Sequence, residues 1–223
     1  MPDFKDENVL EHAIEAFHET IALKVRQLRR YVPKAKVSTN PELTGAFIEE
    51  LVRGFIRGWL GDKQLLHGTF YSKQHIDSGE KPMQIDGIVH VPARGPLVIN
   101  EGDFAILHPA FSAGIIEIKM TISSISKFEE RLQTIYGRYL GHLTKPHVLG
   151  IVVADKNPEK TSVIAEKDGK QYFYHDYRVA NWCPIFVLFQ ETDDGDYIPF
   201  MPGIECMIRA IFGNLYASTN YIG

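Results

Sequence analysis

The sequence predicts an α/β protein with a mixed central β-sheet flanked by helices, and three observations predict this class. Residues 148–155 and 183–190 are nearly continuous apolar runs, which are typical of strands buried on both faces of a sheet. Residues 10–32 keep the period of an amphipathic helix. Shorter apolar segments at 64–72 and 84–91 are bounded by Gly, Pro and polar residues, as strands are. The 223 residues, 44% of them hydrophobic, suit one globular domain with or without a terminal extension.

The first predicted helix covers residues 10–32, where apolar residues recur in alternating steps of three and four. Its last turns hold the main basic block of the chain: Lys24, Arg26, Arg29 and Arg30. Two interpretations of Arg29 and Arg30 stay open. They are either solvated cations that suit a helix C-terminus, or groups that contact nucleic-acid phosphates. We predict that residues 1–36 form a helical extension to a domain of residues 37–223.

The second predicted helix runs from Pro41 to about residue 59, because Asn40 is a good N-cap and proline suits the first helical position. We expect its buried stripe to consist of large apolar residues spaced by four, namely Leu43, Phe47, Leu51, Phe55 and Trp59. Glu49 lies at the margin of that stripe, where a carboxylate can point into a cleft. Two alternatives stay open: Glu49 forms only an exposed i,i+4 pair with Arg53, or Glu50 takes its place.

Residues 64–72 and 84–91 are interpreted as a hairpin with a long polar loop, and residues 114–120 as a third short strand. The capping-box spacing of Ser126 and Glu129 marks the start of the next helix, which we expect to end near residue 141.

Asp168-Gly169, within residues 163–174, predicts a second, tight hairpin. The two apolar runs at 148–155 and 183–190 are the expected central strands. An amphipathic segment from about residue 204 to 215 predicts the final helix.

Composition excludes several classes of protein. No apolar run approaches the roughly 18 residues of a membrane-spanning helix, and the amino end lacks the pattern of a signal peptide, so we expect a cytoplasmic protein. Two cysteines, Cys183 and Cys206, are too few for a disulfide scaffold or a four-cysteine metal site. The net charge of -4 argues against binding nucleic acid through overall charge, but a local basic patch is not excluded.

The strand at 114–120 carries the residues that suggest chemistry. Side chains alternate along a strand, so Glu117 and Lys119 share one face. If Asp86 projects from the neighbouring strand into the same place, two carboxylates and the carbonyl oxygen of Ile118 offer oxygen ligands for Mg²⁺ or Mn²⁺. Lys119 would then orient or deprotonate an attacking water and offset charge that develops on phosphorus. These residues predict metal-dependent hydrolysis of phosphodiesters.

With these motifs, the sequence resembles the PD-(D/E)XK nuclease superfamily, whose signature is an aspartate on one strand and Glu/Asp-x-Lys on the next. Asp86 and Glu117-Ile118-Lys119 match that signature. The likeness looks closer to an uncharacterised bacterial branch, through residues 45–49, 84–89 and 117–123. Two departures are the missing proline before the aspartate and Ile48, which stands where the branch commonly has a basic residue.

The resemblance implies a restriction-endonuclease-like α-β-β-β-α-β core and a magnesium-dependent nuclease that acts on DNA, in bacterial defence or DNA processing. Gln84 either holds the scissile phosphate or only satisfies backbone groups at the sheet end. A second hypothesis is an inactive binding or assembly module with the same fold. That module would use its first and last helices to contact a second copy or a partner protein. A third hypothesis is a magnesium enzyme that acts on a small phosphate ester.

Overall fold

The computed structural model describes residues 41–211, except 59, 72–76, 78, 80, 103, 123, 141–146, 159–164, 168–169, 173–183 and 195–196. Five further positions between 12 and 23 are described, and all five are helical. The rest of the predicted first helix, with Arg29 and Arg30, lies outside the described residues. So do Asn40, Trp59 and Cys183.

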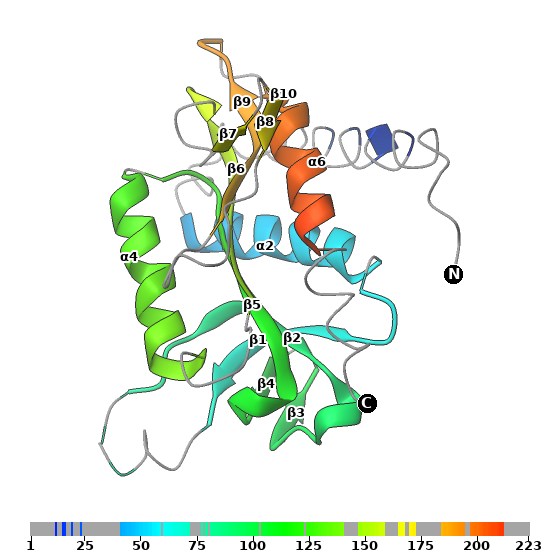
Figure 1. Ribbon diagram of the computed structural model, residues 1–223, viewed down its shortest axis with the longest axis vertical. Coiled ribbons are helices and arrows are strands. Elements are labelled where there is room, and N and C mark those ends of the chain that lie inside the picture. Colours follow the sequence, from blue (N-terminus) through cyan, green and yellow to red (C-terminus); the bar gives the residue numbers. More distant parts are fainter. Residues whose placement is uncertain are drawn as a thin grey trace.

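A mixed sheet of eight strands forms the centre of the molecule (Figure 1). Its strands are β1 Gln64–Phe70, β2 Ile85–His90, β3 Ile99–Glu101, β4 Phe104–Leu107, β5 Ser112–Lys119, β6 His147–Asp155, β9 Ile185–Glu191 and β10 Tyr197–Pro199. Their spatial order is β10-β9-β6-β5-β2-β1-β4-β3. A separate two-stranded sheet pairs β7 Ala165–Lys167 with β8 Lys170–Tyr172.

The α/β class and its mixed central sheet are confirmed. β1 and β2 form the expected antiparallel hairpin, with Leu65 opposite Val89. β6 runs parallel to both β5 and β9, inside the sheet, as the continuous apolar runs predicted. The antiparallel pair β7 and β8 confirms the hairpin expected at Asp168-Gly169.

Three strands were not predicted. β3 and β4 form one edge of the sheet, where β4 lies parallel to β1, and β10 forms the other edge. Each has only three or four residues, too few for a period to be recognised.

Helices cover both faces of the sheet (Figure 1). These helices are α2 Pro41–Arg57, α4 Ile125–Ile135, a π-helical turn Tyr136–Leu140 that continues α4, and α6 Met201–Ala210. Two short 3₁₀ helices connect strands: Pro92–Arg94 lies between β2 and β3, and Pro109–Phe111 lies between β4 and β5. One buried cluster joins α2 and α6 to one face, and a second joins α4 to the other. None of the helices that the structure describes is long and apolar enough to cross a membrane.

Two local predictions were wrong. The most buried stripe of α2 is Ile48, Val52 and Ile56, at most 1% exposed, whereas Phe47 is 38% exposed. Leu51 and Phe55 of the expected stripe are only partly buried, at the edge of the same cluster. The helix has two adjacent apolar lines, and packing against β1 and β5 selected the line one residue away from the expected one. The N-cap of α4 is Ser124, whose hydroxyl accepts a hydrogen bond from the Lys127 N–H, and not Ser126.

Candidate active site

The candidate site lies where β2 separates from β5. The two strands pair through Gly87 and Ile116, and β5 then continues to Lys119 alongside β6. Past that pair, the Ile118 N–H donates to Asp86 Oδ2 at 2.9 Å. The carboxylate of Asp86 therefore occupies the place next to β5 that a strand backbone would otherwise fill.

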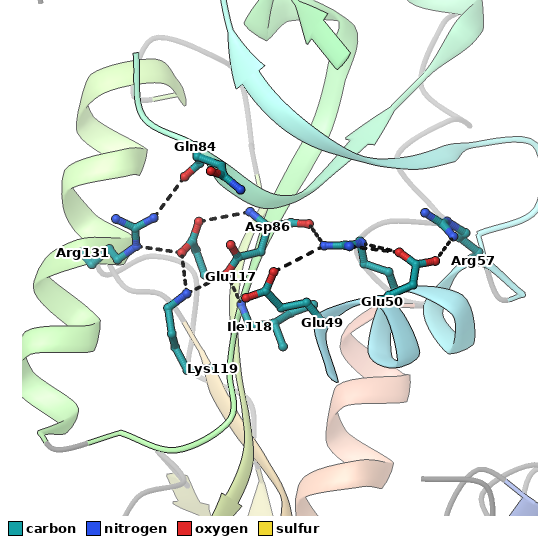
Figure 2. A network of polar contacts seen from close by, with 10 residues as sticks. Glu49, Glu50, Arg57, Gln84, Asp86, Glu117, Ile118, Lys119 and Arg131 are labelled. Atoms are coloured by element: carbon teal, nitrogen blue, oxygen red, sulfur yellow. Dashed lines mark hydrogen bonds and ion pairs between the residues drawn. The ribbon is translucent and has the colours of Figure 1, made fainter. Parts of the chain in front are cut away.

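Asp86, Glu117 and Lys119 meet at this point (Figure 2). Lys119 Nζ lies 2.9 Å from Asp86 Oδ2 and 3.8 Å from Glu117 Oε2. The Asp86 N–H donates to Glu117 Oε1 at 3.4 Å. Ile116 and Ile118 pack into the core on the side of α2, as strand alternation predicted. The structure thus brings together the three residues expected to converge, while their catalytic role stays a prediction.

Glu117 is buried and crowded by charge. Its side chain is 0% exposed, and Arg131 of α4 donates from Nε to Glu117 Oε2 at 2.7 Å. Burial, and then the negative charge of Asp86, raise the pKa of Glu117 to about 7, although Arg131 and Lys119 act in the opposite direction. A cation beside both carboxylates would relieve this repulsion.

Glu49 approaches the same carboxylates from α2. Burial, and then the charge of Asp86, raise the pKa of Glu49, while Lys119 and Arg53 oppose the shift. Glu49 also lies 3.7 Å from Arg53, the partner that the i,i+4 alternative named, but the pair is not exposed, since Arg53 is buried. Glu50 is 46% exposed and contacts Arg53 and Arg57. Figure 2 shows Glu49 directed toward Asp86 and Glu50 directed toward Arg57.

The oxygen atoms of this site suit a hard divalent cation. In the described part of the chain, no group of three or more His, Cys, Asp or Glu side chains is arranged to hold a metal ion. Mg²⁺ does not require such a group, because it retains several waters and needs one or two carboxylates. Asp86, Glu117 and the carbonyl of Ile118 fit that requirement by their chemistry.

No protein-family model matches the chain, and no curated protein matches it. Solved structures do match. NucC from E. coli MS115-1, in its cAAA-bound form, aligns with a TM-score of 0.50 and 12% identity over 94% of this chain and 96% of NucC. NucC from P. aeruginosa ATCC27853, also cAAA-bound, gives a TM-score of 0.51 and 12% identity over 94% and 97%. The chain has a NucC-like fold.

The sequence did not identify two arginines of this NucC-like fold as parts of the site. Arg131 bonds Glu117 and also donates from Nη2 to the Gln84 carbonyl at 3.1 Å. Arg53, only 6% exposed, donates to the Asp86 carbonyl at 2.9 Å. The i,i+4 spacing identified Arg53 as a partner of Glu49, but no local pattern relates either arginine to a strand that is distant in sequence.

Of the remaining residues named from the sequence, the structure describes Gln84 and Ile48 but not Arg29 and Arg30. The side chain of Gln84 is exposed, and its carbonyl accepts the bond from Arg131. Ile48, which stands where the branch commonly has a basic residue, lies in the core. The cation beside Glu49 is instead Arg53, one turn later in the helix. The proposed phosphate contacts of Gln84, Arg29 and Arg30 stay predictions.

Proposed function

We propose that this protein is a metal-dependent nuclease that hydrolyses phosphodiester bonds in DNA. The observation that carries the proposal is the meeting of Asp86, Glu117 and Lys119 where β2 separates from β5. The NucC-like fold supports it, since NucC is a PD-(D/E)XK-type nuclease. Because the structural neighbours are NucC, a nuclease of bacterial anti-phage defence, we propose the same setting here, with the cytoplasm as the location.

The finer fold belongs to the same proposal. We propose that α2, β1, β2, β5, α4 and β6 are the α-β-β-β-α-β core of a restriction-endonuclease-like domain of residues 37–223. β3 and β4 are then an insertion between the second and third core strands. Residues 1–36 are the N-terminal extension of that domain.

Each group at the site would have a separate task. Asp86, Glu117 and the Ile118 carbonyl would hold Mg²⁺ or Mn²⁺, and the bound ion polarises a phosphoryl oxygen and lowers the pKa of water. Lys119 would orient the attacking water and stabilise the negative charge of the transition state. Glu49, half-buried beside Asp86, would accept a hydrogen bond from a water at the edge of the site.

One observation favours the alternative of an inactive binding module. Lys119 and Arg131 already form ion pairs with Asp86 and Glu117, so each carboxylate has a cationic partner without a metal ion. A module that retains the fold for partner contacts would need nothing more at this place.

A cleavage experiment separates the two functions. Purified protein is incubated with double- and single-stranded DNA and with RNA, in Mg²⁺, in Mn²⁺ and in chelator. We expect cleavage of DNA only with a divalent ion, and loss of both cleavage and Mn²⁺ binding in Asp86→Asn. The matched control is Asp155→Asn, because Asp155 lies five residues beyond Gly150, the β6 residue that is opposite Glu117. Wild-type protein that neither binds Mn²⁺ nor cuts nucleic acid would leave the binding module as the better interpretation.

A further inference from the structure

Arg131 occupies an oxygen of the buried carboxylate that the proposed function assigns to a metal ion. Its Nε donates to Glu117 Oε2 at 2.7 Å, the shortest contact that Glu117 makes in the described chain. The other oxygen, Oε1, accepts from the Asp86 N–H. A divalent ion that binds Glu117 therefore meets a guanidinium already seated on the carboxylate.

Glu117 cannot easily turn away from Arg131, but Arg131 can leave Glu117. Glu117 is 0% exposed within a strand that is paired with β6, whereas the side chain of Arg131 is 36% exposed on α4. Arg131 also donates from Nη2 to the Gln84 carbonyl, which can hold one end of the guanidinium while Nε turns away from Glu117. Two cations that share one carboxylate oxygen repel each other. Binding of a divalent ion should consequently displace the guanidinium toward solvent.

The displaced group is well suited to a phosphate. A guanidinium is planar, keeps its charge at every physiological pH and binds phosphate oxygens through two parallel N–H bonds. Arg131 contacts Glu117 directly, so a strand cut at a metal ion held by Glu117 would pass beside this guanidinium. Resting on the proposed nuclease function, we propose that Arg131 exchanges partners: it holds Glu117 in the metal-free protein and binds a DNA phosphate when a divalent ion takes Glu117.

The exchange is tested on three variants of the full chain: Arg131→Gln, Arg131→Lys and Lys127→Gln. Lys127 is the matched control because it is exposed one turn earlier on α4 and has no acidic partner in the described residues. Calorimetry measures Mn²⁺ affinity in the absence of DNA. Fluorescence anisotropy measures the affinity for a labelled DNA duplex in chelator and in Mn²⁺, with Lys119→Ala added to every protein to prevent cleavage. Thermal melting verifies that each variant folds.

We expect opposite changes in the two affinities. Arg131→Gln should bind Mn²⁺ about tenfold more tightly, since a charge-assisted competitor is gone. It should bind DNA about tenfold more weakly in Mn²⁺, with a salt slope smaller by about 1, and like the parent protein in chelator. Arg131→Lys should change in the same directions by less, because it keeps the charge without the fork. Lys127→Gln should leave the Mn²⁺ affinity unchanged and should change the DNA affinity by the same factor in chelator and in Mn²⁺.

Three results would overturn the inference. If the wild-type protein binds Mn²⁺ and cuts DNA while Arg131→Gln changes neither affinity, Arg131 has no role in the site and the proposed function stands. If Arg131→Gln weakens DNA binding equally in chelator and in Mn²⁺, the phosphate contact is permanent and no exchange occurs. If the wild-type protein binds no Mn²⁺, the proposed function fails as well. Should Arg131→Gln not fold, the same comparisons are made with Arg131→Lys.

Discussion

Glu117 combines complete burial with a negative neighbour, and this makes the stability of the metal-free protein depend on pH. Its pKa is raised to about 7 from an ordinary value of 4.5, first by burial and then by Asp86. Between these values the folded state holds more protons than the unfolded state. The free energy of unfolding therefore falls as pH rises through this window.

We predict that Glu117→Gln reduces this pH dependence. The wild-type protein in chelator should lose at most about 3 kcal/mol of stability between about pH 4.5 and about pH 8 through this group. The variant should lose less, although Glu49 still contributes in the same direction because its pKa is also raised by burial. Urea denaturation at the two pH values measures the difference. Glu130→Gln, which changes an exposed carboxylate of α4, is the control and should match the wild-type slope.

Lys119 is the residue whose loss best separates catalysis from architecture. Its side chain is 35% exposed, so Lys119→Ala opens no cavity in the core, and its cost in stability is the lost ion pair with Asp86. Hydrolysis should nevertheless fall by orders of magnitude, because the ammonium acts mainly on the transition state, while DNA affinity stays nearly the same. Initial cleavage rates and anisotropy measure the two effects. Cleavage at the wild-type rate would indicate a contaminant or another site.

At the scale of elements, two helical glycines have opposite structural roles. A Cβ atom added to Gly203 of α6 would lie only 1.8 Å from the Val187 carbonyl oxygen of β9, whereas one added to Gly54 of α2 would meet nothing within 4 Å. The close approach at Gly203 thus allows α6 to pack on the sheet beside α2 (Figure 1).

We predict opposite changes in stability for alanine at these positions. Gly203→Ala should lower the free energy of unfolding by about 1–3 kcal/mol or more, because the backbone must shift to admit the methyl group. Gly54→Ala should raise it by up to about 1 kcal/mol through better helix propensity and a less flexible unfolded chain. Urea denaturation of both variants tests the pair. Equal stability of Gly203→Ala and the wild-type protein would contradict the packing of α6 on β9.

At the scale of the whole molecule, the net charge of -4 means that DNA binding must depend on local basic groups. We predict that replacing both Arg29 and Arg30 with Gln weakens binding to unrelated DNA duplexes alike. The salt slope should fall by up to about 2, since each lost phosphate contact removes about one counterion. Anisotropy at several salt concentrations measures this, and the Lys double variant, which keeps the charges, should bind nearly like the wild-type protein. Unchanged binding of the Gln variant would favour the solvated-helix interpretation of this block.

The sequence by itself determined the features that depend on near neighbours along the chain. Two-residue alternation put Glu117 and Lys119 on one face of a strand, with Ile116 and Ile118 on the other. Continuous apolar runs predicted β6 and β9 as interior strands, and a two-residue turn predicted the pair β7 and β8. These features follow from periods of a few residues, which a linear sequence displays directly.

Only the tertiary structure decided the contacts between distant elements. Periodicity could not choose between the two apolar lines of α2, because both are equally regular and only packing against β1 and β5 distinguishes them. The same holds for the bonds from Arg53 to the Asp86 carbonyl and from Arg131 to Glu117, which join residues 33 and 14 positions apart. Such contacts depend on the register of β2 against β5 and on the seating of each helix on the sheet. Register and seating result from burial summed over the whole core, so no short segment of the sequence contains them.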